Sequence, residues 1–246
     1  MKLTRTSTIV TFYSAIALLS AAILGLAFYV RSGLPNPKMS EFVDVGKQGS
    51  ETWLPIEKDL EGYQQDGTHV KLSDLKGKVW VAAEFFAVCP HCAVRNGEEL
   101  RKLYDEFKDD PDFHIVCITV DPENDKREKL HEYAEALSAD SSHWWFMNAG
   151  DEKKTHEYLE NELKFFGIRE RTDPVDIETN GRFEHDLSFL LVNRDMQIIG
   201  KWNLAGARSE VARQQDPDEY SRLKKEMFDR IRIELAKPAN NTASGS

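Results

Sequence analysis

Two of the three cysteines in this chain are separated by only two residues. Cys89 and Cys92 form a C-x-x-C motif where an apolar stretch, residues 79–87, gives way to a helical pattern from about 92 to 108. The amino end of a helix offers free amide donors and a positive dipole end, which favour the thiolate form of a cysteine. Thiolates attack disulfides and are soft ligands for Cu(I). The motif therefore predicts a redox centre or a copper site.

Two other uses of the motif are less consistent with the sequence. An inert structural disulfide is disfavoured by the junction between strand and helix, where cysteines are reactive. A structural zinc site needs a second pair of ligands, and the chain contains no second C-x-x-C and no H-x-x-x-H. The third cysteine, Cys117, lies inside the apolar stretch 113–120 and is expected to be a core residue.

His185 is the histidine best placed to be a further ligand. It comes just before an apolar stretch at residues 187–193, in the second half of the chain. The other histidines outside the motif lie among polar residues or on expected helix faces, so they are interpreted as solvated or capping residues. They are His69, His114, His131, His143 and His156.

The elements that must position these residues alternate between strands and helices. Nearly continuous apolar stretches predict central strands buried on both faces, and amphipathic spacing predicts the helices. This order is typical of an α/β thioredoxin-like fold, with a central mixed β-sheet flanked by helices. A β element is expected at 59–72 around a turn at 65–67, with strands at 79–87, 113–120, 144–147, 187–193 and 197–202, and helices at 92–108, 125–137, 153–166 and 217–235.

The amino-terminal part predicts a membrane anchor. Residues 8–30 carry no charge and are long enough to cross a bilayer as a transmembrane helix. The slight excess of basic residues before them favours a single-pass protein of the cell inner membrane, with the soluble domain on the exported, periplasmic or equivalent, side. A cleaved signal peptide is the alternative. The expected organisation is an anchor at 1–30, a linker at 31–50, the thioredoxin-like domain at 51–237 and a disordered tail at 238–246.

Charge excludes one class of partner. The formal net charge is -10, and basic residues alternate with acidic ones instead of forming a patch. A phosphate backbone would repel such a surface, so nucleic acid is not an expected partner.

Several segments together resemble the SCO/SenC family. They are residues 66–78 (DGTHVKLSDLKGK), the strand and dithiol that follow, residues 118–125 (ITVDPEND), and His185 ahead of FLLV at 189–192. The Val-Asp-Pro segment and the late histidine are the more specific elements. The resemblance extends over roughly residues 59–202.

The resemblance implies a function as well as a fold. Family members carry a thioredoxin-like domain on a membrane anchor and bind copper, Cu(I) or Cu(II), through two cysteines and the late histidine. By position, the ligands in this chain are Cys89, Cys92 and His185. Members help to assemble the copper centre of cytochrome c oxidase, as metallochaperones or by reducing its cysteines. A copper-accepting or disulfide-bearing exported protein, such as an oxidase subunit, is the implied partner.

Two features depart from or qualify this pattern. The family has three residues between the cysteines, whereas this chain has two, and Cys-Pro-His-Cys resembles strongly oxidising thiol-disulfide oxidoreductases. Conversely, such enzymes place a cis-proline before the third core strand, where this chain has His185 and no proline between Pro174 and Pro217.

Three functions therefore remain open from the sequence. The first is a copper-binding module. The second is a thiol-disulfide oxidoreductase in which Cys89 attacks and Cys92 resolves. The third is a redox-inert scaffold. The mixed-charge segment 167–184 is interpreted as a mobile loop over the site, which would bring His185 into reach when metal binds.

Overall fold

The computed structural model describes residues 13, 20, 54–87 and 90–238, the side chains of residues 90–95 excepted. The chain divides into two units, Met1–Asp44 and Val45–Ser246. Within the described part, no helix is both long enough and apolar enough to cross a membrane. The anchor, linker and tail expected from the sequence lie outside the described residues, apart from Tyr13, Ser20 and Pro238.

A six-stranded mixed sheet forms the centre of the domain, in the order β1-β10-β9-β4-β5-β6. The strands β4, β5 and β6 are parallel, whereas β9 runs antiparallel to β4 and to β10. Every residue of β4, β5, β6 and β9 is buried, as expected for apolar strands covered on both faces. The six strands are β1 (Leu54–Pro55), β4 (Val79–Phe85), β5 (Phe113–Thr119), β6 (Trp144–Met147), β9 (Phe189–Val192) and β10 (Gln197–Trp202).

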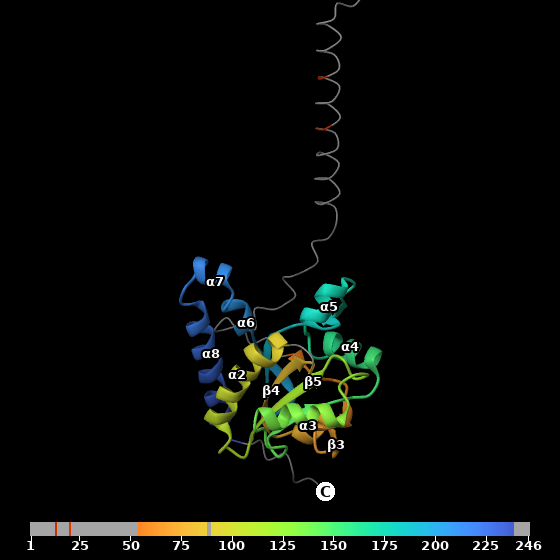
Figure 1. Cartoon of the computed structure of the whole chain (residues 1–246). Coiled ribbons are helices and arrows are strands. Elements are labelled where there is room, and N and C mark those ends of the chain that lie inside the picture. The colour runs from red at the N-terminus through yellow and green to blue at the C-terminus, as the bar shows by residue number, and fades with distance from the viewer. Residues whose placement is uncertain (1–12, 14–19, 21–53, 88–89, 239–246) are drawn as a thin grey trace, which may run out of the picture. The chain divides into compact units, whose positions relative to one another are not determined.

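One face of the sheet packs against three helices, α2 (Pro90–Phe107), α3 (Arg127–Ala136) and α8 (Glu219–Leu235) (Figure 1). Each helix contributes apolar residues at helical spacing to this face, as the sequence predicts. Two short helices, α6 (Leu204–Ala207) and α7 (Glu210–Gln215), connect β10 to α8. The buried helix residues on this face include Leu100, Leu103, Phe107, Leu130, Met227 and Ile231.

The other face is covered by helix α4 (Glu152–Asn161) and by a hairpin of β2 (Glu61–Tyr63) and β3 (His69–Lys71), which leads into the 3-10 helix η1 (Leu72–Leu75). The hairpin matches the β element expected at 59–72. Helix α4 ends earlier than the expected 153–166. Lys164, beyond its end, has φ +58, a left-handed conformation that a helix cannot contain.

The segment 167–184, called the insertion because it interrupts the path from α4 to β9, contains two strands and a helix, which corrects its interpretation as a loop. Strands β7 (Arg169–Glu170) and β8 (Phe183–Glu184) pair with each other, and α5 (Pro174–Asn180) lies between them. Asp173 caps α5 by accepting hydrogen bonds from the N–H groups of residues 175 and 176, with Pro174 at the first helical position. Several charged residues of the segment thus serve as a cap or as ion-pair partners.

Candidate metal and thiol site

The dithiol segment connects the end of β4 to the start of α2. Cys92 is the third residue of α2, and the first turn of that helix contains no acidic residue that would offset its positive dipole end. Cys89 lies outside the described residues, and the side chain of Cys92 does too. The backbone nevertheless places the motif at the strand-to-helix junction that the sequence predicts.

A buried carboxyl group fixes the chain two residues before Cys89. The Oδ2 atom of Asp125 accepts a hydrogen bond from the Ala87 N–H at 3.0 Å and one from the Thr119 hydroxyl at 2.5 Å. Burial raises the pKa of Asp125 above its usual range. The segment 118–125, which contains the Val-Asp-Pro sequence, therefore contacts the residues just before the dithiol through its last residue, Asp125.

His185 lies between β8 and β9, and its side chain is 3% exposed. Its Nδ1 is 2.9 Å from the carbonyl oxygen of Asp186, and its ring meets the ring of Phe86 edge to face, with centroids 5.4 Å apart. Because a carbonyl oxygen can only accept, Nδ1 carries the proton. In the neutral ring the lone pair is then on Nε2, the nitrogen that could bind a metal.

The fold brings His185 and the dithiol segment to the same edge of the sheet. Strands β4 and β9 are antiparallel neighbours, with Ala83 opposite Phe189, so the chain leaving β4 meets the chain entering β9. Phe86, three residues before Cys89, touches the His185 ring, and Asn96 of α2 donates a hydrogen bond to the Leu187 carbonyl at 3.1 Å. These contacts support the grouping expected from the sequence, although the sulfur atoms lie outside the described part.

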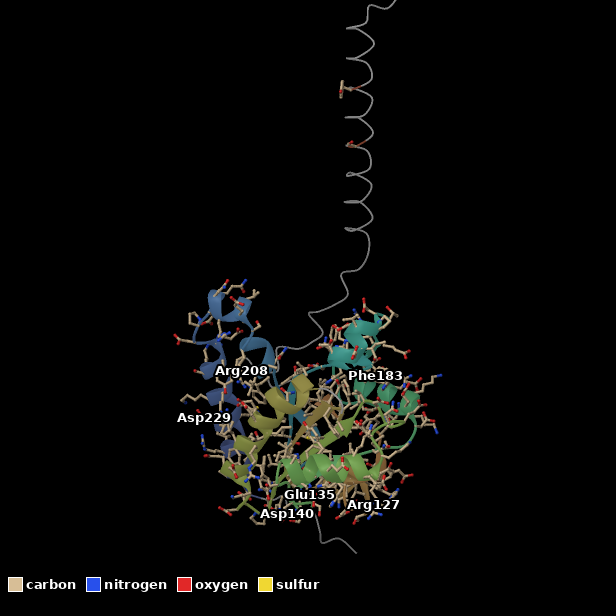
Figure 2. All side chains as sticks on the ribbon, in the orientation of Figure 1. Arg127, Glu135, Asp140, Phe183, Arg208 and Asp229 are labelled. Carbon is tan, nitrogen blue, oxygen red and sulfur yellow. The ribbon has the colours of Figure 1, made fainter. Side chains whose placement is uncertain are left out.

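The insertion 167–184 packs against Phe86 at this edge of the sheet. Gly181, at the end of α5, has φ +80, and a Cβ atom there would lie 2.0 Å from the ring of Phe86. Phe183, labelled in Figure 2, is buried and meets the His156 ring edge to face at 5.0 Å. His185 is thus held at this edge of the sheet by described residues, and a movement that brings it into reach of the dithiol when metal binds stays a prediction.

Sequence reasoning missed Glu84, which lies beside His185. Glu84 is 1% exposed at the next-to-last position of β4, with Oε2 at 3.6 Å from the Nδ1 of His185. Burial raises the pKa of Glu84, while the neighbouring His185 opposes that shift. The signal was present in the sequence, because Glu84 is the one charged residue in the apolar stretch 79–87.

Cys117 and His114, both in β5, do not lie at this edge. His156 does lie near it: the ring is half-buried rather than solvated, and its Nε2 is 2.6 Å from the carbonyl oxygen of Val120, just after β5. Cys117 is fully buried and accepts a hydrogen bond from the Trp144 indole N–H at 3.4 Å, which confirms that it is a core residue. His114 is buried rather than solvated, which corrects that expectation. Among the described side chains, no three His, Cys, Asp or Glu residues form a group that could hold a metal ion.

The comparison with protein families decides the relationship. The family model described as SCO1/SenC matches residues 51–216. The chain belongs to the SCO1/SenC family. A curated relative, the "SCO1 protein homolog" of Bacillus subtilis (strain 168), is 28% identical over 156 residues, which cover 61% of this chain and 76% of the relative. The family resemblance of the sequence is confirmed.

Solved structures of the family share the fold. BsSco, described as a member of the Sco family of cytochrome c oxidase assembly proteins with a disulfide switch, gives a TM-score of 0.56 at 21% identity, covering 76% of this chain and 96% of its own. Yeast Sco1 with copper bound gives 0.54 at 13% identity, covering 78% and 96%. The thioredoxin-like fold with a mixed central sheet is confirmed.

Proposed function

We propose that this protein binds copper through Cys89, Cys92 and His185, and that it delivers copper to a respiratory oxidase copper centre or reduces the cysteines of that centre. One observation carries the proposal. The Nδ1–H of the buried His185 ring is hydrogen-bonded to the Asp186 carbonyl, so the ring is preset with Nε2 as its donor. An anchor at residues 8–30 would hold the site on the exported side of the inner membrane.

The donor set suits copper. Two thiolates and one imidazole form a soft, three-coordinate site for Cu(I), and a further ligand would allow Cu(II). The family relationship supports the choice of metal, because the structure of yeast Sco1 contains bound copper. It supports the choice of partner, because BsSco is described as a member of a family of cytochrome c oxidase assembly proteins. Within this chain, Asp125 fixes the approach to Cys89 and Asp186 orients His185, so both sides of the site are held by buried groups.

Metal analysis after anaerobic reconstitution with Cu(I) tests the proposal. The wild-type protein should retain about one copper per chain, and His185→Ala should weaken copper binding at least about tenfold while leaving the reactivity of the thiols largely intact. His69→Ala, which replaces an exposed histidine of β3, is the matched control and should bind like wild type. Equal copper affinity in the His185→Ala and wild-type proteins would remove His185 from the site.

Thiol-disulfide exchange on exported client proteins is the second candidate function. It is favoured by the position of Cys92 in the first turn of α2, because that turn contains no acidic residue that would oppose a thiolate. The Cys89 thiolate would attack a client disulfide, forming a mixed disulfide and releasing one client thiolate. After losing its proton, Cys92 would attack the Cys89 sulfur, forming the Cys89–Cys92 disulfide and releasing the second client thiolate. The client is reduced and the dithiol is oxidised.

A trapping experiment separates the two functions. Cys92→Ala should accumulate mixed disulfides between Cys89 and client proteins, because the resolving thiol is missing. The double variant Cys89→Ala/Cys92→Ala is the control and should trap nothing. Combining Cys92→Ala with His185→Ala should leave trapping unchanged. If Cys92→Ala forms no mixed disulfide in cells, exchange with a client is excluded as the main activity.

A further inference from the structure

Glu84 is a buried carboxyl group near the end of β4, an interior strand of the sheet. All seven residues of β4 are buried, and the other six are apolar. Burying a carboxyl group costs free energy unless hydrogen bonds or charges compensate, so an apolar residue would fit this position with less cost. The Oε1 atom of Glu84 has no hydrogen-bond partner among the described residues. The role of Glu84 must therefore come from the contacts of its other oxygen, Oε2.

Oε2 of Glu84 holds the main chain next to His185. It accepts a hydrogen bond from the Asp186 N–H at 2.8 Å, and the Asp186 carbonyl in turn accepts the hydrogen bond from His185 Nδ1 at 2.9 Å. The separation between Oε2 and Nδ1 is 3.6 Å, which is too long for a direct hydrogen bond but short enough for electrostatic attraction. Glu84 thus acts on His185 mainly through Asp186.

Asp186 is held from its side chain as well. Its Oδ1 accepts a hydrogen bond from the Ser188 N–H at 2.8 Å, and its Oδ2 accepts one from the Phe166 N–H at 2.8 Å and pairs with Lys201 Nζ at 2.7 Å. With the main-chain N–H bound to Glu84, the carbonyl of Asp186 has a fixed direction. The His185 ring that donates to it is therefore fixed in orientation.

We propose that Glu84 is a positioning residue for His185: it fixes Asp186 so that the ring keeps Nδ1–H on the Asp186 carbonyl and presents Nε2 to copper. This inference rests on the proposed function. Glu84 faces the Nδ1 side of the ring, opposite Nε2, so it is not a ligand of an ion bound at Nε2. Groups of this kind fix the tautomer and ring direction of metal-binding histidines in other proteins.

The tautomer of His185 in the copper-free, reduced full chain gives the first readout. Nitrogen-15 NMR of the full chain in detergent micelles, at alkaline pH where imidazoles are neutral, should show His185 protonated at Nδ1. Glu84→Met, which keeps the length of the side chain but removes the acceptor, should shift His185 toward a mixture of tautomers. Glu84→Gln keeps one acceptor oxygen for the Asp186 N–H and should largely retain the wild-type tautomer.

Copper affinity gives the second readout. Glu84→Met should bind Cu(I) about 10- to 100-fold more weakly than wild type, and Glu84→Gln should lose less. Glu162→Gln is the matched control, because Glu162 is also a buried carboxylate that accepts main-chain N–H groups, those of Glu57 and Lys58, but it does not contact His185. It should change neither the tautomer nor the affinity.

The outcomes are distinguishable. A wild-type His185 protonated at Nε2 overturns the positioning role without any variant, so the inference stays testable even if Glu84→Met does not fold. A folded Glu84→Met protein with the wild-type tautomer and wild-type copper affinity overturns it as well. If the wild-type protein binds no copper, the proposed function fails, and the tautomers of wild type and Glu84→Met still decide whether Glu84 orients the ring.

Discussion

Replacing His114 by leucine should make the protein more stable in acid, by about 3 kcal/mol at about pH 4. His114 lies in β5 and is 2% exposed, and its Nε2 has no hydrogen-bond partner among the described residues. Burial lowers the pKa of His114 from 6.5 to about 3, with smaller contributions from His143 and Lys78. A buried imidazolium would lack both water and a partner, so the folded protein keeps this ring neutral.

The sign of the effect follows from the protonation of His114 in the folded and in the unfolded protein. Between about pH 6.5 and about pH 3, the unfolded chain binds a proton at His114 and the folded chain does not. The stability of the wild-type protein therefore falls as the pH drops through this window. Leucine has no proton to bind, so the variant escapes this loss. Above about pH 7 both states are neutral, and only the small change in packing remains.

Urea unfolding at about pH 4 and about pH 8, followed by tryptophan fluorescence, measures the difference. His131→Leu is the control, because His131 is an exposed residue of α3 that pairs with Glu135 and carries no comparable burial. The prediction fails if His114→Leu changes the free energy of unfolding equally at both pH values.

His114 also shows where the interpretation of the sequence was wrong although the sequence held the signal. The stretch 113–120 was correctly predicted to be a strand buried on both faces, and that prediction already places position 114 in the interior. The expectation that His114 is solvated followed from its polar side chain alone and not from its position in the strand. Glu84 was missed for the same reason, although it interrupts the apolar stretch 79–87. A polar residue inside a doubly buried strand is the signal that was overlooked.

The positions of two candidate site residues along the strands and helices were predicted correctly from the sequence. Cys92 lies in the first turn of α2, and His185 comes just ahead of β9, because hydrophobic periodicity fixes the boundaries of such elements within a few residues. The partners of His185 could not be predicted. They depend on which strands are neighbours, since Glu84 meets Asp186 only because β4 pairs with β9. The insertion 167–184 was misjudged because its order comes from caps and from Phe183 in the core, not from periodicity.

Arg194 is the other residue whose replacement should have a large effect. The sequence predicts only that residue 194 lies between the strands at 187–193 and 197–202, but the side chain of Arg194 is 9% exposed and connects three places in the chain. Its Nη1 donates to the Gly77 carbonyl and to Asp112 Oδ2, each at 2.7 Å, and its Nη2 donates to the Leu235 carbonyl at 3.2 Å. It thereby joins the chain ahead of β4 and β5 to the end of α8.

Arg194→Met should lower the free energy of unfolding by about 2 kcal/mol, because it removes three hydrogen bonds made by a nearly buried guanidinium and leaves the half-exposed Asp112 without its cation. Arg194→Lys should lower the free energy of unfolding by less than Arg194→Met but should not reach the wild-type value. An ammonium group cannot make the same three hydrogen bonds as a planar guanidinium. Arg213→Met, at a basic residue of α7, is the control and should stay within about 0.5 kcal/mol of wild type.

Hydrogen exchange can show whether the loss is local or global. Since one of the three bonds ends on Leu235, the last residue of α8, the Met variant should speed amide exchange in the last turn of α8 more than in α3, which Arg194 does not contact. Equal acceleration in both helices would mean that Arg194 acts only through global stability. An unchanged free energy of unfolding would mean that water replaces the guanidinium at all three acceptors, and that the turn residue does not tie α8 to the sheet.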